Sequence, residues 1–235
     1  MTTYMTPTAE TATIRTSAIK LHGPEGFEGM RKAGRLAAEI LDAIAPMVVP
    51  GAVTSQIDDA VRTMMLDAGA VPATLGYHGY QYSCCISLNN VICHGMPGER
   101  VLKDGDILNI DVTPLVDGWH GDTSRMYLVG DVPIKARRLV DVTYECLMLG
   151  IEQARPGNTL GDVGYAIQTH AEKHRFTIEP MINAGKPAVK MLEDGWTAVT
   201  RDRSLSAQFE HSIGITEDGC EIFTLSPKGL HRPPY

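Results

Sequence analysis

The fold is decided by the stretch ILNIDVTPLVDGWHGDTSRMY, residues 107–127. Its centre, Asp117-Gly118, is typical of a two-residue type I′ turn, so the residues on either side are predicted to pair as a β-hairpin. Alternate residues of a strand point to opposite faces, which places Leu108, Ile110 and Val112 together on one face. This apolar face is expected to pack into a core and to hold the hairpin in place.

The other face of the hairpin carries two aspartates. With Val116 opposite Trp119, outward pairing places Thr113 opposite Asp122 and Asp111 opposite Ser124. Asp111 and Asp122 are then diagonal neighbours with Cβ atoms roughly 7–8 Å apart or less, so their carboxylates can converge. Aspartate is uncommon in strands, and such a pair repels unless it is neutralised. The pattern therefore predicts either a metal site or an acid–base pair.

Length, composition and charge narrow the class of protein. A chain of 235 residues with 43% apolar residues forms one large domain or two small ones. The net charge of −7 argues against nucleic acid as the main partner and against a basic membrane-binding patch. An odd number of cysteines, five, does not fit a disulfide framework, and the first 13 residues hold no apolar signal-peptide core. We therefore expect a cytoplasmic protein that does not enter a membrane.

Helical periodicity and turn signals outline an α+β plan. Helices are expected over residues 24–44, 56–68, 134–155 and 160–174, the second capped by Thr54 or Ser55. Short strands are expected between and after them, over residues 84–88, 91–93, 176–179, 188–192, 197–200, 207–215 and 220–225. Helix pairs thus alternate twice with antiparallel hairpins. We expect one domain over residues 14–227, a disordered tail over residues 1–13 and a second tail over residues 228–235.

Two further acids extend the candidate site. Glu179 ends a predicted strand, and Glu210 lies in another with Gln208 and Ser212 on its face. Four carboxylates on strands suit Mn²⁺, Fe²⁺, Co²⁺ or Zn²⁺, and a pair of such ions activates water for hydrolysis. His94 lies in a loop, where it can donate a hydrogen bond to a substrate or an oxyanion.

Two helical histidines receive a different interpretation. His170 and His174 are spaced by four residues, which allows metal chelation on a helix, but no glutamate follows the first of them as in metalloproteases. We interpret them as a solvated helix end.

The junction between Arg175 and Phe176 is physically unusual. A helix normally ends with Gly, Asn or a nearby Pro, and a connection of roughly 2–6 residues normally leads to the next strand. Here the helical pattern runs straight into the strand over residues 176–179. The sequence therefore predicts that a segment is missing between these two residues.

Eight motifs together resemble type I methionine aminopeptidase, over about residues 20–227. They are YHGY (77–80), CISLN (85–89), CHGMP (93–97), DGDILNIDVT (104–113), HGDT (120–123), TIEP (177–180), GWT (195–197) and SAQFEH (206–211). The resemblance implies the creatinase/aminopeptidase, or pita-bread, fold, with two α/β halves around a curved antiparallel sheet. It also implies removal of the initiator methionine from new polypeptides whose second residue is small.

The resemblance also implies roles for individual residues. Two divalent ions (Co, Mn, Fe or Zn) would be held by Asp111, Asp122, Glu179 and Glu210, with Asp122 and Glu210 bridging. Catalytic roles fall to His94, which contacts substrate, and to Glu179, a candidate proton shuttle. The methionine pocket would be lined by Tyr77, Tyr80, Cys85 and Trp196, and a monovalent cation in some members would lie near Asn89, Val91 and Ser206. The implied partners are N-terminal methionine peptides and nascent chains at the ribosome, and the enzyme is expected to act as a monomer.

One departure from the family falls at the unusual junction. Members carry a His-Gly-Ile-Gly motif between the fourth helix and the TIEP strand, and its histidine is a metal ligand; a second histidine downstream of it contacts the substrate. Both are absent here, where Arg175 meets Phe176 directly. Either the segment is omitted or deleted, which the intact motifs on both sides favour, or the chain is an inactive aminopeptidase-like scaffold that binds without catalysis.

Overall fold

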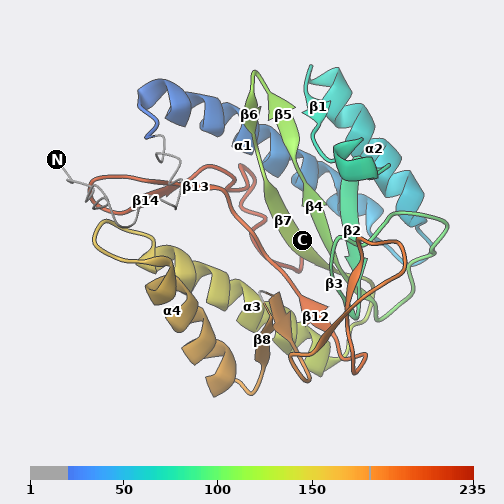
Figure 1. Ribbon diagram of the computed structural model, residues 1–235. Coiled ribbons are helices and arrows are strands. Elements are labelled where there is room, and N and C mark those ends of the chain that lie inside the picture. Colours follow the sequence, from blue (N-terminus) through green and yellow to red (C-terminus); the bar gives the residue numbers. More distant parts are fainter. Residues whose placement is uncertain (1–20, 180) are drawn as a thin grey trace, which may run out of the picture.

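The computed structural model describes residues 21–179 and 181–235, and the side chains of residues 178–180 are not part of that description. The N-terminal tail expected over residues 1–13 lies outside the described residues. Helices and short antiparallel strands alternate along the chain, as the sequence predicted (Figure 1). None of the described helices is long and apolar enough to cross a membrane.

The hairpin forms the centre of the molecule. Strand β4 (Ile107–Val112) pairs with β7 (Thr123–Leu128) on one side and with β2 (Cys84–Leu88) on the other. The hairpin continues into β5 (Pro114–Val116) and β6 (Trp119–His120), and β1 (Val71–Pro72) pairs with β5. Asp117 and Gly118 have φ values of 50° and 87°, as a type I′ turn requires. The predicted register is confirmed, with Val116 opposite Trp119 and Asp111 opposite Ser124.

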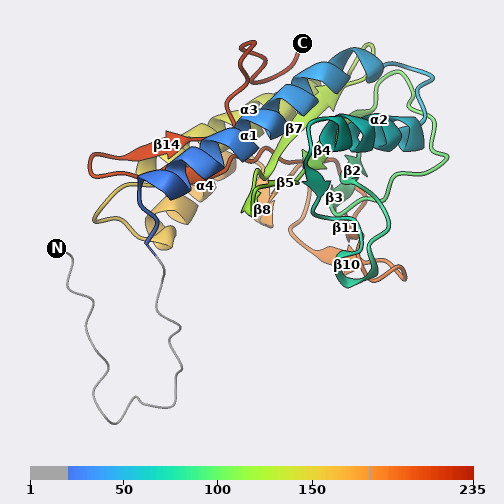
Figure 2. The same ribbon diagram turned by 90° about the horizontal axis from the view of Figure 1, so that it is seen from above.

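The first half of the fold covers the apolar face of this sheet. Helices α1 (Pro24–Ile44) and α2 (Thr54–Asp67) pack with Leu108, Ile110 and Val112, which are all fully buried. Figures 1 and 2 show both helices on one side of the central strands. The cap expected at Thr54 or Ser55 was wrong: α2 begins at Thr54, whose hydroxyl donates to the Gly98 carbonyl at 2.9 Å. Single 3₁₀ turns follow α1 (Ala45–Met47) and precede β2 (Tyr77–Gly79).

The second half packs on the opposite face of the same strands. Helix α3 (Ile134–Gln153) and helix α4 (Leu160–Lys173) enclose a second core that includes Ile107 and Met126. Strands β8 (Thr177–Glu179), β9 (Met181–Asn183) and β12 (Ser206–Ala207) form a sheet in the order β12-β9-β8 beside α3. Successive side chains of β4 therefore point to opposite faces of the sheet. Leu108, Ile110 and Val112 enter the first core, whereas Ile107 and Asp111 face the second half of the fold.

Three-stranded and two-stranded sheets complete the architecture. Strands β3 (Val91–Cys93), β11 (Ala198–Thr200) and β10 (Val189–Met191) pair in the order β10-β11-β3, and β13 (Ile213–Ile215) pairs with β14 (Cys220–Ile222). The continuous strand expected over residues 207–215 was wrong. It is broken between Ala207 and Ile213, because the intervening residues bond to the hairpin instead.

The junction after α4 forms a tight helix-terminating motif. The Phe176 N–H donates to the Ala171 carbonyl at 3.0 Å, and the Arg175 N–H donates to the Glu172 carbonyl at 2.9 Å. This is the Schellman arrangement, in which a left-handed residue, normally glycine, follows the helix. Arg175 occupies that position with a φ of 65°. The helix therefore does end at the predicted place, but with a residue poorly suited to the conformation.

The C-terminal segment is fastened to the body of the protein. The expectation of a tail over residues 228–235 needs correction, because the Tyr235 hydroxyl donates to the Met126 carbonyl at 3.0 Å and its ring packs 5.1 Å from that of Tyr127. The segment nevertheless forms no helix or strand. Its attachment runs through single side chains rather than through backbone pairing, which a sequence pattern does not reveal.

Candidate metal centre

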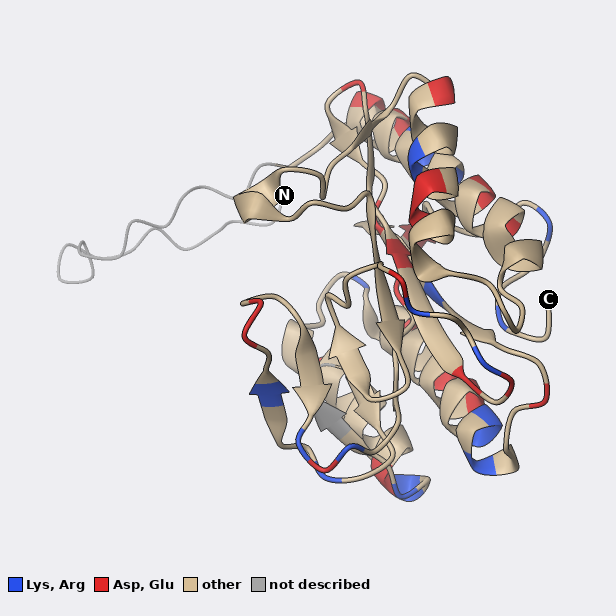
Figure 3. Cartoon of the chain, turned by 90° about the vertical axis from the view of Figure 1, so that its right-hand side faces the viewer, with Lys and Arg blue, Asp and Glu red and all other residues tan. Residues whose placement is uncertain are grey.

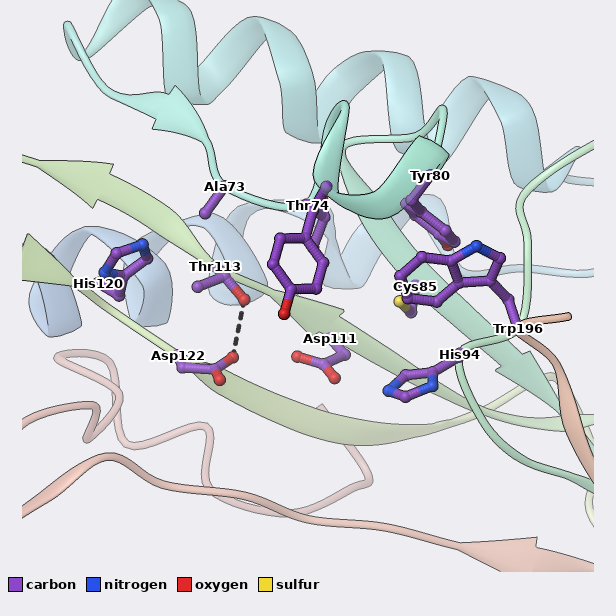
Figure 4. Close-up of a pocket in the computed structure, with 11 residues that line it drawn as sticks. Ala73, Thr74, Tyr80, Cys85, His94, Asp111, Thr113, His120, Asp122 and Trp196 are labelled. Atoms are coloured by element: carbon purple, nitrogen blue, oxygen red, sulfur yellow. Dashed lines mark hydrogen bonds between the residues drawn. The ribbon is translucent and has the colours of Figure 1, made fainter. Parts of the chain in front are cut away.

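The hairpin brings the two predicted aspartates together. Asp111 lies on β4 and Asp122 lies just before β7, and both carboxylates point into one cavity (Figure 4). The Thr113 hydroxyl donates to Asp122 Oδ1 at 2.8 Å and orients that carboxylate. Gly121 fits this strand closely against α1, because a Cβ at that position would lie 2.1 Å from the Ala33 carbonyl oxygen. The glycine before Asp122 is therefore a steric requirement of the site.

Backbone pairing brings Glu210 to the same place. Its N–H donates to the Ser124 carbonyl at 3.2 Å, and its carbonyl accepts the Thr123 hydroxyl at 2.7 Å. Two residues on, the Ser212 hydroxyl donates to the Asp122 carbonyl at 2.7 Å. The segment that replaces the predicted strand is thus joined to β7, and Glu210 stands beside Asp122.

The three carboxylates form a cluster that fits a cation. One oxygen from each of Asp111, Asp122 and Glu210 lies within 4.8 Å of the others. Among the described residues, no group donates a hydrogen bond to the buried Asp111 Oδ1. Figure 3 shows acidic residues on the central strands as well as on the outer helices. A divalent ion would neutralise this charge and supply the partner that the oxygen lacks.

The local electrostatics support the same interpretation. Burial, followed by repulsion from Glu210 and Asp122, raises the pKa of Asp111 well above its usual value. Burial and the charge of Asp122 raise the pKa of Glu210 to about 7, although a hydrogen bond from Gln208 opposes the shift. Carboxyl groups that resist ionisation in the metal-free state are stabilised as anions when a cation binds between them.

The structure places Glu179 only through its backbone. Glu179 pairs with Met181 in the sheet that also contains β12. Strand β12 ends at Ala207, three residues before Glu210. The position of its carboxylate lies outside the described side chains. Its assignment as a fourth ligand and proton shuttle stays a prediction.

The predicted substrate-binding residues line one cavity together with the aspartates. The cavity measures about 350 Å³, and its walls include all five candidates, Tyr77, Tyr80, Cys85, His94 and Trp196. The Trp196 ring lies 5.2 Å from that of Tyr80, 6.3 Å from that of Tyr77 and 5.9 Å from that of His94. The cavity therefore has an aromatic end and a carboxylate end, both visible in Figure 4.

Cys85 supplies a neutral sulfur to this cavity. Burial, followed by repulsion from Asp111, raises the pKa of its thiol to about 12. Beside it, the Tyr80 hydroxyl donates to the Cys84 carbonyl at 3.0 Å, which holds the ring in the wall of the cavity. A protonated thiol acts as a small apolar group, so Cys85 is suited to packing rather than to nucleophilic attack.

Comparison with known proteins decides the family. The model of metallopeptidase family M24 matches residues 28–216. The methionine aminopeptidase of Rickettsia prowazekii is 49% identical over 257 residues, which cover 92% of this chain and 99% of that protein. The enzyme of the same name from Escherichia coli K12 is 44% identical, covering 88% and 94% of the two chains. The chain belongs to the methionine aminopeptidases of family M24.

Solved structures of methionine aminopeptidases confirm the fold predicted from the resemblance. The crystal structure of the Rickettsia prowazekii protein superposes with a TM-score of 0.86 at 46% identity, covering 88% of this chain and 99% of that one. The crystal structure of the Thermotoga maritima methionine aminopeptidase superposes with a TM-score of 0.84 at 33% identity, covering 87% of this chain and 98% of that one. The prolidase from Pyrococcus furiosus, at 17% identity and a TM-score of 0.70, shares the fold alone. The pita-bread architecture and the metallopeptidase family are therefore established.

The chain is shorter than these two relatives inside the matched region. The Rickettsia alignment spans 257 residues, whereas 92% of this 235-residue chain is about 216 residues. The Escherichia coli alignment spans 249 residues against about 207 from this chain. Some 40 positions of each alignment therefore have no counterpart here. The sequence predicts that they fall at the Arg175–Phe176 junction.

Several contacts in this site were not assigned a role from the sequence. Thr113 was placed opposite Asp122 by the register, yet its hydrogen bond to the carboxylate was not foreseen. Gln208 was placed on the same face as Glu210, and its Nε2 donates to Glu210 Oε2 at 3.1 Å. His120 also lines the cavity, and no periodicity or spacing marks it out.

The residues implied for a monovalent cation lie near one another through backbone contacts. The Ser206 N–H donates to the Asn89 carbonyl at 2.9 Å, and β3, which begins at Val91, pairs with β11 beside them. The Ser206 hydroxyl is buried, and no described residue hydrogen-bonds to it. The arrangement is compatible with the prediction, which stays a prediction.

Proposed function

We propose that this chain removes the N-terminal methionine from new polypeptides whose second residue is small, using two divalent metal ions. The convergence of Asp111 and Asp122 with Glu210 carries the proposal, because both aspartates also line the aromatic cavity. Glu179 is the fourth proposed ligand. Co, Mn, Fe or Zn are the candidate metals, because hard carboxylate oxygens accept all of them.

When bound, the metal ions supply Lewis-acid polarisation of the scissile carbonyl and activation of water. The chain's own residues select and orient the peptide. Tyr77, Tyr80, Trp196 and the neutral thiol of Cys85 surround the methionine side chain, since a thioether packs well against rings and sulfur. The negative carboxylates at the other end attract the α-ammonium group of the peptide.

Two side chains are proposed to act on the reacting groups. The exposed His94 ring lines the cavity beside Trp196, where it can donate a hydrogen bond to the oxygen of the scissile carbonyl as negative charge develops. Glu179 takes a proton from the attacking water and delivers it to the departing amine. A cavity of about 350 Å³ is large enough for a methionine side chain at its aromatic end.

The proposed cellular setting follows from the substrate. We place the enzyme in the cytoplasm, where it meets nascent chains near the ribosome, and expect it to act as a monomer. We also propose a monovalent cation near Asn89, Val91 and Ser206 as a structural element of the site.

The test uses Asp111→Asn on the full chain. Purified protein is loaded with Co²⁺ or Mn²⁺, and the free methionine released from a Met-Ala-type peptide is measured. The metal content of the protein and its circular dichroism spectrum are measured on the same samples. We expect the variant to retain its fold and lose turnover. Asp117→Asn is the matched control, since Asn also suits a type I′ turn and Asp117 is exposed.

Each outcome of this experiment decides between two functions. Methionine release by the wild type and by Asp117→Asn but not by Asp111→Asn supports the enzyme. Unchanged release by Asp111→Asn contradicts the proposed centre. A folded wild type that binds metal without releasing methionine points to the alternative, an aminopeptidase-like scaffold that has lost activity with its 40 missing positions.

A further inference from the structure

A second group of metal-binding side chains lies on the α3–α4 helix pair. Glu145 belongs to α3, and His170 and His174 belong to the last turn and the C-cap of α4. These two helices pack along each other (Figure 1). The sequence alone suggested a solvated helix end, because Ala171 and not glutamate directly follows His170. The structure places an acid from the neighbouring helix, Glu145, beside the two histidines.

The three side chains already point to one place. His170 Nε2 lies 2.7 Å from Glu145 Oε2, and the two imidazole rings are 4.6 Å apart. One ligand atom from each residue lies within 4.8 Å of the others. Ligand atoms around one tetrahedral zinc ion are about 3.4 Å apart, given Zn–N and Zn–O distances near 2.1 Å. Small rotations of these surface side chains close the difference.

The surroundings leave the cluster open to ions and water. The side chains of Glu145 and His170 are 43% and 20% exposed, and His170 borders a cavity of about 450 Å³. Water can therefore complete the coordination. Arg138 brings a positive charge to the cluster, since its Nη2 lies 3.5 Å from His174 Nδ1. The positive charge of Arg138 opposes the binding of a cation, so replacing this arginine is a specific way to strengthen that binding.

We propose that Glu145, His170 and His174 bind one zinc-class divalent ion, separately from the carboxylate centre. Two imidazoles and one carboxylate suit Zn²⁺ or Ni²⁺, whereas an all-oxygen site also accepts harder ions such as Mn²⁺. A bound ion joins the end of α4 to the middle of α3. It therefore stabilises the last turn of α4, next to the strained Arg175.

The test is zinc binding by the full chain in equilibrium dialysis. An Asp111→Asn/Glu210→Gln background removes ligands of the carboxylate centre, so the remaining zinc reports on the helix pair. We expect about one zinc ion per chain in this background. His174→Ala and Glu145→Gln should each weaken its binding at least tenfold, and Arg138→Gln should strengthen it.

A matched control and a second measurement complete the design. Glu172→Gln changes an acid on the same helix that bonds to Gln168 and not to the cluster, so zinc binding should not change. Zinc at one hundred times its dissociation constant should raise the unfolding temperature by about 5–10 °C, and His174→Ala should abolish the shift. Equal zinc affinity in the background protein, His174→Ala and Glu145→Gln would overturn the proposal, whatever the activity of the carboxylate centre.

Discussion

Replacing Glu210 by glutamine should stabilise the metal-free chain at neutral pH while removing a proposed metal ligand. Glu210 is mostly buried beside Asp122, and its pKa of about 7 lies above the usual value of 4.5. Between these two values the folded chain holds a proton that the unfolded chain has released. The free energy of unfolding therefore falls as pH rises from 4.5 to 7. Glutamine carries no charge, so this loss disappears in the variant.

The size of the effect follows from the shift. Each pKa unit corresponds to about 1.4 kcal/mol. For a shift from 4.5 to about 7, the unfolding free energy of the variant minus that of the wild type should therefore increase by about 3 kcal/mol between pH 4 and pH 8. This is an upper limit, because water reaches part of the cavity. His211 contributes with the opposite sign: burial lowers its pKa to about 4, so it adds stability as pH rises from 4 to 6.5. The difference in unfolding free energy between variant and wild type removes the contribution of His211 and reports on Glu210 together with Asp111, whose pKa the charge of Glu210 raises.

The assay is urea unfolding of the wild type and of Glu210→Gln, in the presence of a metal chelator, at several pH values between 4 and 8. Glu217→Gln serves as the control, because this glutamate is exposed in the β13–β14 turn. Adding Co²⁺ or Mn²⁺ at pH 8 should restore stability to the wild type and not to Glu210→Gln. If the stability difference between them stays constant from pH 4 to pH 8, the carboxylate cluster is not a site of unfavourable charge and the reasoning fails.

Three other predictions concern the scaffold around the site. Gly121→Ala should lower the free energy of unfolding by about 1–3 kcal/mol and weaken metal binding, since its Cβ would meet the Ala33 carbonyl; urea unfolding and metal titration measure both. Arg175→Gly should raise the unfolding free energy by about 1 kcal/mol, because glycine tolerates positive φ; a drop would show that the Arg175 side chain compensates. Asp42→Asn should cost about 3–5 kcal/mol, because it leaves the buried guanidinium of Arg125 without its anion; an unchanged unfolding midpoint would refute this.

Local patterns were sufficient to predict the hairpin and one pair of ligands. A two-residue turn leaves only one register, and alternation then determines the face of every residue from Leu108 to Val112. Asp111 and Asp122 therefore meet as predicted, and Thr113 meets Asp122. Residues of this kind are positioned by their nearest neighbours in the chain, so the sequence contains the information directly.

Contacts between distant segments could not be predicted in the same way. Glu210 was expected inside a regular strand, but the strand breaks because side-chain hydroxyls of Thr123 and Ser212 bind the facing backbone. Glu145 has no pattern that relates it to His170, 25 residues away. The packing of α3 against α4 brings them together, and helix packing depends on many weak contacts rather than on one motif.

The geometry also separates metal binding from the Arg175–Phe176 junction, where the sequence predicts that the chain is shortened. Asp111 and Asp122 are fastened by the hairpin, and Glu210 is fastened by bonds to Ser124 and Thr123. None of these contacts passes through the Arg175–Phe176 junction, whereas Glu179 follows it by only three residues. Three carboxylates should therefore bind a divalent ion even if activity is reduced by the missing positions. Metal binding without methionine release would locate the defect at β8, whereas loss of both would mean that the junction disturbs the hairpin as well.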